Sequence, residues 1–217
     1  VDTKVRLEGY VKSYSNYPVN TLRPWLVMAN TGAGFGGAEE GFASFGFDPL
    51  SASGTGEARG LELLVQKRLS EIPCYGIVSV SYGRTDFTGL DGVSRPGAYD
   101  QRVILNISGG YRFNEKWEFS TKFRFGTGTP WTPYLANGSP DVARYNSERT
   151  PEFHTLDIRV DRRWNFDTWN LITYIDLQNV YNRKNVQRYR FDWRNMKTIE
   201  DAGSIGLLPS IGVSAEF

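Results

Sequence analysis

Few residues in this chain have types and spacings that would support catalysis. His154 is the only histidine, so a Ser-His-Asp triad would have to include it, yet it stands at the start of a predicted strand with no convincing serine partner. The HExxH, CxxC and P-loop motifs are absent, and the glycines of GAGFGG (32–37) lack the strand-to-helix context of a dinucleotide-binding loop. We therefore expect a protein that is not an enzyme and needs no cofactor.

Metal, redox and nucleic-acid chemistry find equally little support. Asp86, Asp91 and Asp100 do not have the EF-hand spacing, so we expect them to be solvated charges and expect no metal site. Cys74 is the only cysteine and lacks the partner of a disulfide or redox motif, which predicts a packed or turn residue. Lysine and arginine number 25 against 24 acidic residues, so no basic field exists to attract nucleic acid.

Most of the chain consists of short segments in which hydrophobic and polar residues alternate. These segments are predicted strands, and they must position the functional side chains. Aromatic residues make up 14% of the chain and it contains 23 glycines, which suits strands joined by glycine-rich turns. No apolar run approaches the ~18–20 residues of a transmembrane helix. The pattern predicts eight strands, at about 4–17, 57–69, 75–86, 102–113, 117–129, 156–166, 169–181 and 207–217.

The alternation separates an apolar face from a charged one. It is clearest in the fourth, fifth and sixth predicted strands. The apolar positions there include Val103, Leu105, Ile107, Phe119, Phe123, Phe125, Leu156, Ile158 and Val160. The opposite positions include Asn106, Ser108, Arg112, Glu118, Lys122, Arg124, Asp157, Arg159, Asp161 and Arg163. Charges at nearly every polar position are more typical of a wet barrel interior than of a sandwich surface.

The connections alternate between short turns and long loops. Residues 18–54 form a long predicted loop, whereas 114–116 and 167–168 are tight turns. Large aromatic residues flank these two turns, among them Trp117 and Trp164, as in the aromatic girdle of an outer-membrane barrel. The sequence therefore predicts an all-β fold, an antiparallel transmembrane β-barrel with eight strands in this chain and both termini on the periplasmic side.

Several stretches also resemble the C-terminal barrel region of TonB-dependent outer-membrane receptors, of the type common in Bacteroidetes. They are GEARGLELLVQKRLS, YDQRVILNISGGYRFNEKWEFSTKFRFGTGTPWTPY, TPEFHTLDIRVDRRW, YIDLQNVYNRKNV and LLPSIGVSAEF. The resemblance begins at about Gly56, and residues 1–55 match only loosely. It implies that residues 1–217 are the C-terminal portion of a barrel of about 22 strands, that 18–54 is an extracellular loop, and that the N-terminal plug domain lies outside this chain.

The same resemblance implies a function in energised uptake of a scarce nutrient, such as a siderophore, cobalamin or a glycan. It implies as partners outer-membrane lipid, TonB acting through the plug, a nutrient ligand and a surface lipoprotein. Phe217 is similar to the terminal aromatic that the barrel-assembly machinery reads. Their placement in the long predicted loops is the one reason to name as candidate ligand contacts Trp25, Trp131, Tyr134, Arg144 and Tyr145. Anchoring at the membrane interface explains most of them equally well.

Two alternatives from other classes stay open at the level of sequence. The first is a self-closed eight-strand barrel that acts as an adhesin or envelope anchor, its interior filled by the paired charges of residues 157–163. The second is a lipid-modifying enzyme of the outer membrane, which would need a serine beside His154. Chain length and the width of the lumen distinguish the first alternative from a transporter.

Overall fold

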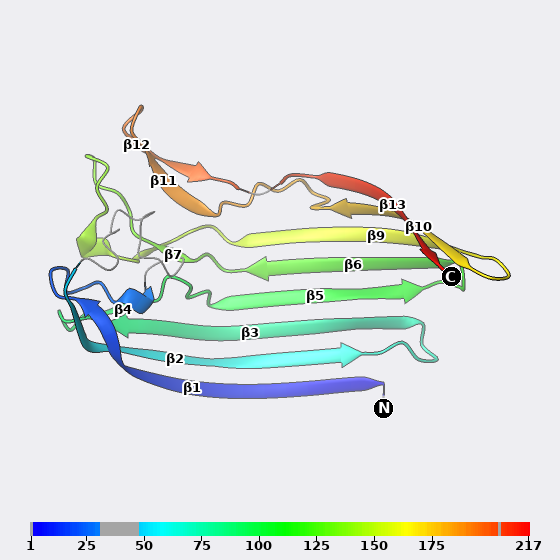
Figure 1. The fold of residues 1–217 in the computed structure, drawn as a ribbon, viewed down its shortest axis with the longest axis horizontal. Coiled ribbons are helices and arrows are strands. Elements are labelled where there is room, and N and C mark those ends of the chain that lie inside the picture. Colours follow the sequence, from blue (N-terminus) through cyan, green and yellow to red (C-terminus); the bar gives the residue numbers. More distant parts are fainter. Residues whose placement is uncertain (1, 31–47, 204) are drawn as a thin grey trace.

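Antiparallel β-strands build nearly all of the structure, a computed structural model that describes residues 2–30, 48–203 and 205–217. Eight strands lie side by side in one sheet, each paired with its neighbour in the antiparallel sense (Figure 1). In order across the sheet they are β1 (Thr3–Asn20), β2 (Leu50–Lys67), β3 (Cys74–Thr88), β5 (Val103–Arg112), β6 (Trp117–Gly126), β9 (Phe153–Asn165), β10 (Asn170–Gln178) and β13 (Leu208–Glu216).

The all-β antiparallel prediction is confirmed, and the eight predicted strands appear in the predicted order. The expected barrel is not closed, because within the described residues β1 and β13 do not pair and remain the two edges of an open sheet. In Figure 1, β1 begins and β13 ends at the end of the sheet that carries the short turns, so the two termini lie at the same end.

The loop predicted over 18–54 is too long at both ends. Strand β1 continues to Asn20 and β2 begins at Leu50, with Val19 opposite Ser51 and Asn20 opposite Leu50. Pro18, which cannot donate to a ladder, signals a strand end in the sequence. Register shifts on both sides of Tyr17 let the strand pass Pro18 and go on. Residues 31–47, including GAGFGG, lie outside the described residues.

Smaller elements extend the ends of the strands where the long connections lie (Figure 1). Strand β4 (Ser94–Pro96) pairs with the end of β3, and two small hairpins form within predicted loops. The hairpins are β7 (Pro130–Trp131) with β8 (Glu148–Arg149), and β11 (Arg188–Asp192) with β12 (Lys197–Asp201); the short helices are η1 (Met28–Asn30) and η3 (Val142–Arg144). Most of these elements are too short for a period to reveal them in the sequence.

The strand register gives the sheet two chemically different faces. Residues that oppose each other across strands point to the same side, so each row of partners belongs to one face. One row on the apolar face crosses six strands and contains only hydrophobic side chains. It consists of Val5, Val65, Val78, Ile107, Phe123 and Leu156. The other side of each strand carries the charged residues, and we call it the polar face.

No second layer covers the apolar face within the described residues. Val11 on β1 is 74% exposed and Ile211 on β13 is 82% exposed. The buried hydrophobic side chains of the described residues are few: Val19, Leu26, Val27, Ala58 and Tyr145. A soluble antiparallel sheet normally packs one face against a core. This sheet instead leaves its apolar face open, and its small core lies mainly among the loops. Among the described residues no helix is long and apolar enough to cross a membrane.

Candidate functional site

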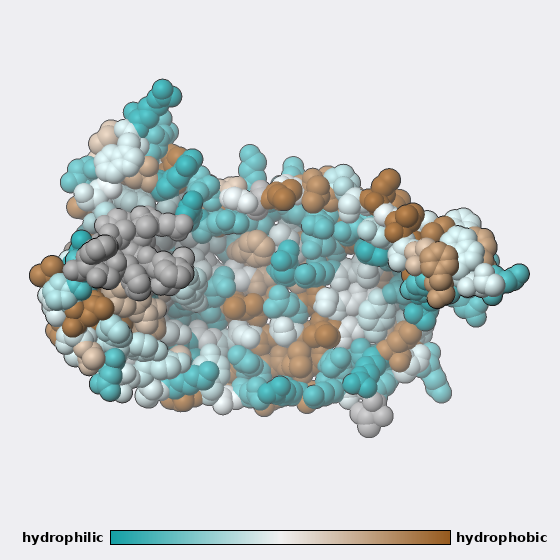
Figure 2. Space-filling model, in the orientation of Figure 1, coloured by the Kyte–Doolittle hydropathy of each residue, from teal (hydrophilic) through white to brown (hydrophobic). Residues whose placement is uncertain are grey.

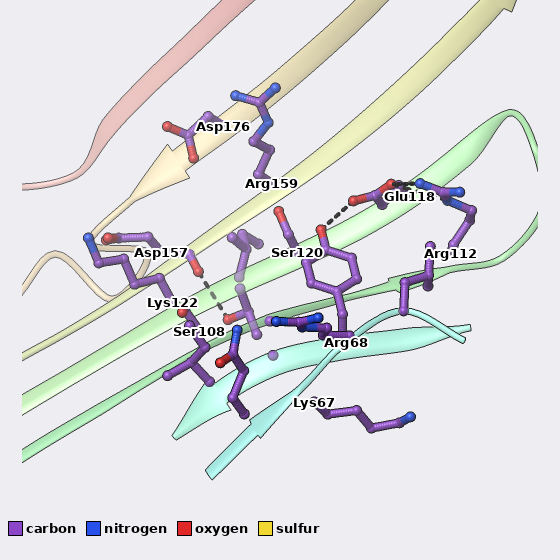
Figure 3. Close-up of a pocket in the computed structure, with 18 of the residues that line it drawn as sticks. Lys67, Arg68, Ser108, Arg112, Glu118, Ser120, Lys122, Asp157, Arg159 and Asp176 are labelled. Carbon is purple, nitrogen blue, oxygen red and sulfur yellow. Dashed lines mark hydrogen bonds and ion pairs between the residues drawn. The ribbon is translucent and has the colours of Figure 1, made fainter. Parts of the chain in front are cut away.

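The polar face of the sheet is hollowed along its middle. Figure 2 shows hydrophilic side chains spread between apolar ones over the face that it presents. A hollow of about 900 Å³ lies against β2, β3, β5, β6, β9 and β10. Figure 3 shows this hollow from close by. The polar side chains that line it include Arg68, Tyr75, Ser108, Arg112, Glu118, Ser120, Lys122, Asp157, Arg159 and Asp176.

Charges on this face are paired with their neighbours in the sheet. The Tyr75 hydroxyl donates to the Glu118 carboxylate, and Arg112 Nε lies 3.5 Å from Glu118 Oε2 (Figure 3). Arg159 Nε donates to both carboxylate oxygens of Asp161, at 3.0 and 2.9 Å, and its guanidinium lies 3.7 Å from the centre of the Tyr174 ring. Such pairs stabilise charged side chains on a sheet face that is only half buried.

Asp157 joins the polar face to the loop end of the sheet. Its Oδ1 accepts from the backbone N–H of Asn179 at 2.9 Å, and its Oδ2 lies 3.8 Å from Arg124 Nη2. Arg159 and Asp161 follow it on the same face of β9. The predicted ladder of alternating charges is therefore present. It provides hydrogen-bonding groups for a polar or charged surface.

The partner of the His154 ring is a tyrosine and not the serine that a catalytic triad would need. Its Nδ1 lies 2.8 Å from the Tyr181 hydroxyl, and its ring lies near that of Phe123. Asn185 binds the His154 backbone on both sides, since its Oδ1 accepts from the N–H and its Nδ2 donates to the C=O, each at 3.1 Å. In the part of the chain that the structure describes, no group of three histidine, cysteine or acidic side chains converges as a metal site requires.

The segment YIDLQNVYNRKNV (174–186) contains three asparagines spaced three residues apart, Asn179, Asn182 and Asn185. Their side chains hold the loop after β10 in place through hydrogen bonds to the backbone. Asn179 binds the backbone of Arg183 with both ends of its amide, at 3.0 and 2.9 Å. Asn182 Oδ1 accepts from the N–H of Leu207 at 2.9 Å. Asn179 and Asn182 also have positive φ angles of 51° and 54°, which asparagine tolerates better than most residues. Together with Asn185 they hold the connection after β10 against β9 and β13.

Asp100 is a buried anchor and not the solvated charge that the sequence predicts. Its side chain is 1% exposed, with Arg102 Nε at 2.7 Å and Arg149 Nη2 at 2.5 Å. Its Oδ1 also accepts from the backbone N–H of Thr85 at 2.8 Å. Arg149 further donates to the carbonyl of Gly128 at 2.9 Å. Burial is possible because two cations and a backbone donor satisfy the carboxylate.

Three of the five predicted ligand residues serve the loops themselves. Tyr145 is 3% exposed, packs on Leu26, and donates from its hydroxyl to the carbonyl of Asn30 at 3.1 Å. Trp25 packs against the same pair. Arg144 forms an exposed ion pair with Glu148, four residues on. The contacts of Trp25 and Tyr145 connect the loop after β1 to the loop before β9, whereas the Arg144–Glu148 pair lies within the second of these loops.

The other two, Trp131 and Tyr134, lie in an aromatic cluster at the loop end. The ring of Trp131 is 4.4 Å from that of Tyr189, and the ring of Tyr134 is 5.7 Å from that of Phe191. Trp193 continues the cluster and is 65% exposed. A hollow of about 120 Å³ lies between the two segments. The sequence analysis did not predict Tyr189, Phe191 and Trp193 as part of this cluster. Their alternation at every second position of 189–193 is a strand pattern that could have indicated them.

Phe217 lies at the opposite end, beside the turn between β9 and β10. Its ring centre is 6.0 Å from that of Trp169, which in turn stacks on Phe166 at 4.4 Å. Phe217 is 99% exposed. The predicted crowding of aromatic rings near this short turn is therefore present in space.

Comparison with models of known protein families finds no match, and comparison with curated proteins finds none either.

Proposed function

We propose that this chain forms part of the wall of a β-barrel in the bacterial outer membrane and acts in TonB-dependent uptake of a scarce nutrient. The observation that carries the proposal is the continuous apolar face, uncovered across all eight strands, opposite a face of paired charges. Lipid on one side and a wet lumen on the other would satisfy both faces, as in known transmembrane barrels. A soluble sheet of this composition would expose its hydrophobic side to water.

The dimensions of the sheet fit a membrane span. Strands β5 and β6 each contain 10 residues, and a transmembrane β-strand needs about 9–11. Charged residues limit the apolar face at both ends: Arg59 opposes Arg84 towards the loops, and Arg162 opposes Trp117 towards the short turns. Long loops gather at one end and tight turns at the other (Figure 1), the asymmetry of outer-membrane barrels.

The open edges favour a wide barrel over the self-closed eight-strand alternative. Unpaired backbone groups in lipid cost several kcal/mol each, so β1 and β13 need partner strands in a membrane. In the described part of the chain they pair neither with each other nor with another strand on their outer sides. We propose that further strands of the same barrel occupy both edges, and that a plug lies against the polar face. An adhesin or anchor made of these eight strands alone has less support.

Transport itself rests on the resemblance of the five quoted stretches to TonB-dependent receptors. In this proposal the aromatic cluster of Trp131, Tyr134, Tyr189, Phe191 and Trp193 faces the exterior, and Trp131 and Tyr134 are the ligand contacts retained from the sequence. Phe217 is the terminal aromatic for the barrel-assembly machinery. A surface lipoprotein is a proposed partner of the loops.

The membrane orientation can be tested with neighbouring residues of β3. Val78 lies on the apolar face between Val65 and Ile107, and Ser79 lies on the polar face between Leu64 and Asn106. An arginine facing lipid near the midplane costs about 2–4 kcal/mol. We expect Val78→Arg to reduce the folded protein in the outer-membrane fraction strongly and Ser79→Arg to leave it near wild type. Equal levels of the two variants would contradict the proposed orientation.

Transport can be tested in the native host. Deletion of the gene and deletion of TonB, the energy-coupling protein, should give the same growth defect on limiting iron, cobalamin or glycan. A strain that lacks both should grow no worse than either single deletion strain. A deletion strain that grows like wild type under each limitation would contradict the proposed uptake function while leaving the membrane orientation intact.

A further inference from the structure

Arg162 places a positive charge on the apolar face, near the short turns. On β9 it opposes Trp117 of β6 and Thr173 of β10, and Thr173 in turn opposes Val213 of β13. One row closer to the middle of the sheet the corresponding residues are all apolar: Phe119, Val160, Ile175 and Ile211. The arginine therefore marks the border between hydrocarbon-like surface and the aromatic end of the strands.

Two indole rings hold the guanidinium in place. Its central carbon lies 3.8 Å from the centre of the Trp164 ring and 5.1 Å from that of Trp117. Trp164 is itself fixed, because its Nε1 donates to the Thr173 hydroxyl at 3.2 Å. Cation–π contacts of this kind orient an arginine without neutralising its charge.

No anion compensates this charge among the residues that the structure describes. Arg162 Nε is buried without a hydrogen-bond partner, and the guanidinium enters no ion pair with a described carboxylate. The adjacent Asp161 and Arg163 lie on the polar face, because neighbouring residues of a strand point to opposite sides. A cation on an apolar surface favours an anionic ligand, since charge there is costly unless it is paired.

An apolar hollow begins at this arginine. It has a volume of about 570 Å³ and lies across β6, β9, β10 and β13. Its side chains from the apolar face are Trp117, Val160, Arg162, Thr173, Ile175, Ile211 and Val213. Ile211 and Val213 are 82% and 72% exposed, so the hollow is open to the surface at β13. Arg162 is the only charged residue among those that line this hollow, which we call the groove.

We propose that this groove binds one anionic phospholipid of the periplasmic leaflet. The phosphate accepts hydrogen bonds from the terminal nitrogens of Arg162, and an acyl chain lies over Val160, Ile175 and Ile211. Charge-assisted hydrogen bonds between arginine and phosphate are among the stronger ones in proteins. The assignment rests on the proposed membrane location and adds to it a specific lipid class, position and recognising residue.

The test uses the full-length protein in phosphatidylcholine vesicles that contain phosphatidylglycerol as a minor component. Flotation with the vesicles is measured first, and native mass spectrometry in detergent then counts the lipids retained by each molecule. Arg162→Gln is compared with wild type and with Arg163→Gln, which removes the same charge one residue away on the polar face. We expect all three proteins to float and Arg162→Gln alone to retain about tenfold less phosphatidylglycerol, which corresponds to about 1.4 kcal/mol.

The outcomes separate the lipid site from the proposed function. If all proteins float and Arg162→Gln retains as much phosphatidylglycerol as Arg163→Gln, the lipid site is wrong and the membrane proposal stands. Equal retention of phosphatidylcholine and phosphatidylglycerol by wild type would likewise overturn recognition of the headgroup by Arg162. If wild type does not float, the membrane proposal fails and the lipid site fails with it.

Discussion

Asp100, in the loop before β5, and Arg149, in the small strand β8, lie 49 residues apart in the chain and form an ion pair in which the carboxylate is almost completely buried. Arg149 also donates to the backbone carbonyl of Asp100 at 2.6 Å. The pair fastens the end of the loop before β5 to the small strand β8. It shows that the loop end of the sheet is an organised structure, which a surface that binds a ligand with defined geometry requires.

Asp100→Ala should loosen this connection. The substitution leaves two arginines without their carboxylate, and hydrogen bonds to charged groups are worth about 1.5–3 kcal/mol each. Both arginine side chains are about a third exposed, so water replaces part of the loss. We expect the free energy of local opening at Thr85 to fall by about 2 kcal/mol. Amide exchange of Thr85 should then be about 30-fold faster than in wild type. Asp91→Ala, which breaks an ion pair within one loop, should leave Thr85 unchanged.

Asn185→Ala should fray the start of β9. The amide makes two hydrogen bonds to the His154 backbone, and a buried backbone group left without a partner costs about 1–3 kcal/mol. Hydrogen exchange of the His154 amide is expected to accelerate at least tenfold. The matched control is Asn137→Ala, because Asn137 accepts a local hydrogen bond from the Ser139 N–H in an exposed turn. Unchanged exchange at His154 would show that the strand pairs alone hold this segment.

Trp131→Ala should release the β11–β12 hairpin from the loop before β9. Trp131 contacts Tyr189 at 4.4 Å between ring centres, and an aromatic pair contributes about 0.5–1.5 kcal/mol beyond its buried area. Amide exchange in 188–201 should rise several-fold. Trp193→Ala removes a ring of the same type that is 65% exposed, so its effect on the hairpin should be smaller.

The same cluster gives a prediction for uptake. If Trp131 and Tyr134 contact ligand, their double replacement by Ala should lower uptake several-fold, while Tyr134→Phe, which keeps the ring, should retain most of it. Uptake equal to wild type in the double variant would remove both residues from the ligand site and leave them a structural role.

The loop that contains Asp91 and Arg95 should respond to acid. The hydrogen bond from Arg95 lowers the pKa of the Asp91 carboxyl below its usual value of 3.8, although partial burial opposes this effect. A lowered folded-state pKa means that the ion pair stabilises the loop above pH 3.8 and that this stabilisation is lost as the pH falls through the folded value. Amide exchange of Val93, whose N–H binds Asp91, should report the loss. In Asp91→Asn the acid-dependent step should disappear.

The strands were predictable from sequence because each face of a strand has its own chemical environment. Ile107 and Ser108 are neighbours on β5, yet one continues an apolar row and the other a polar one. This alternation was enough to place eight strands in order, to within a few residues at most ends. Prediction failed where local signals mislead, as at Pro18, where register shifts allow β1 to continue to Asn20.

The sequence by itself determined that the protein is an antiparallel all-β structure with one apolar and one charged face, since a period of two is a local property that survives without knowledge of partners. Only the tertiary structure decided that β1 and β13 are the edges of the sheet formed by the described residues, that Asp100 is buried, and that Trp131 contacts Tyr189. It also decided that Arg162 contacts the rings of Trp117 and Trp164 and lines an apolar groove. These relationships join residues from different strands and loops, and they depend on strand register and loop paths that no periodic pattern records.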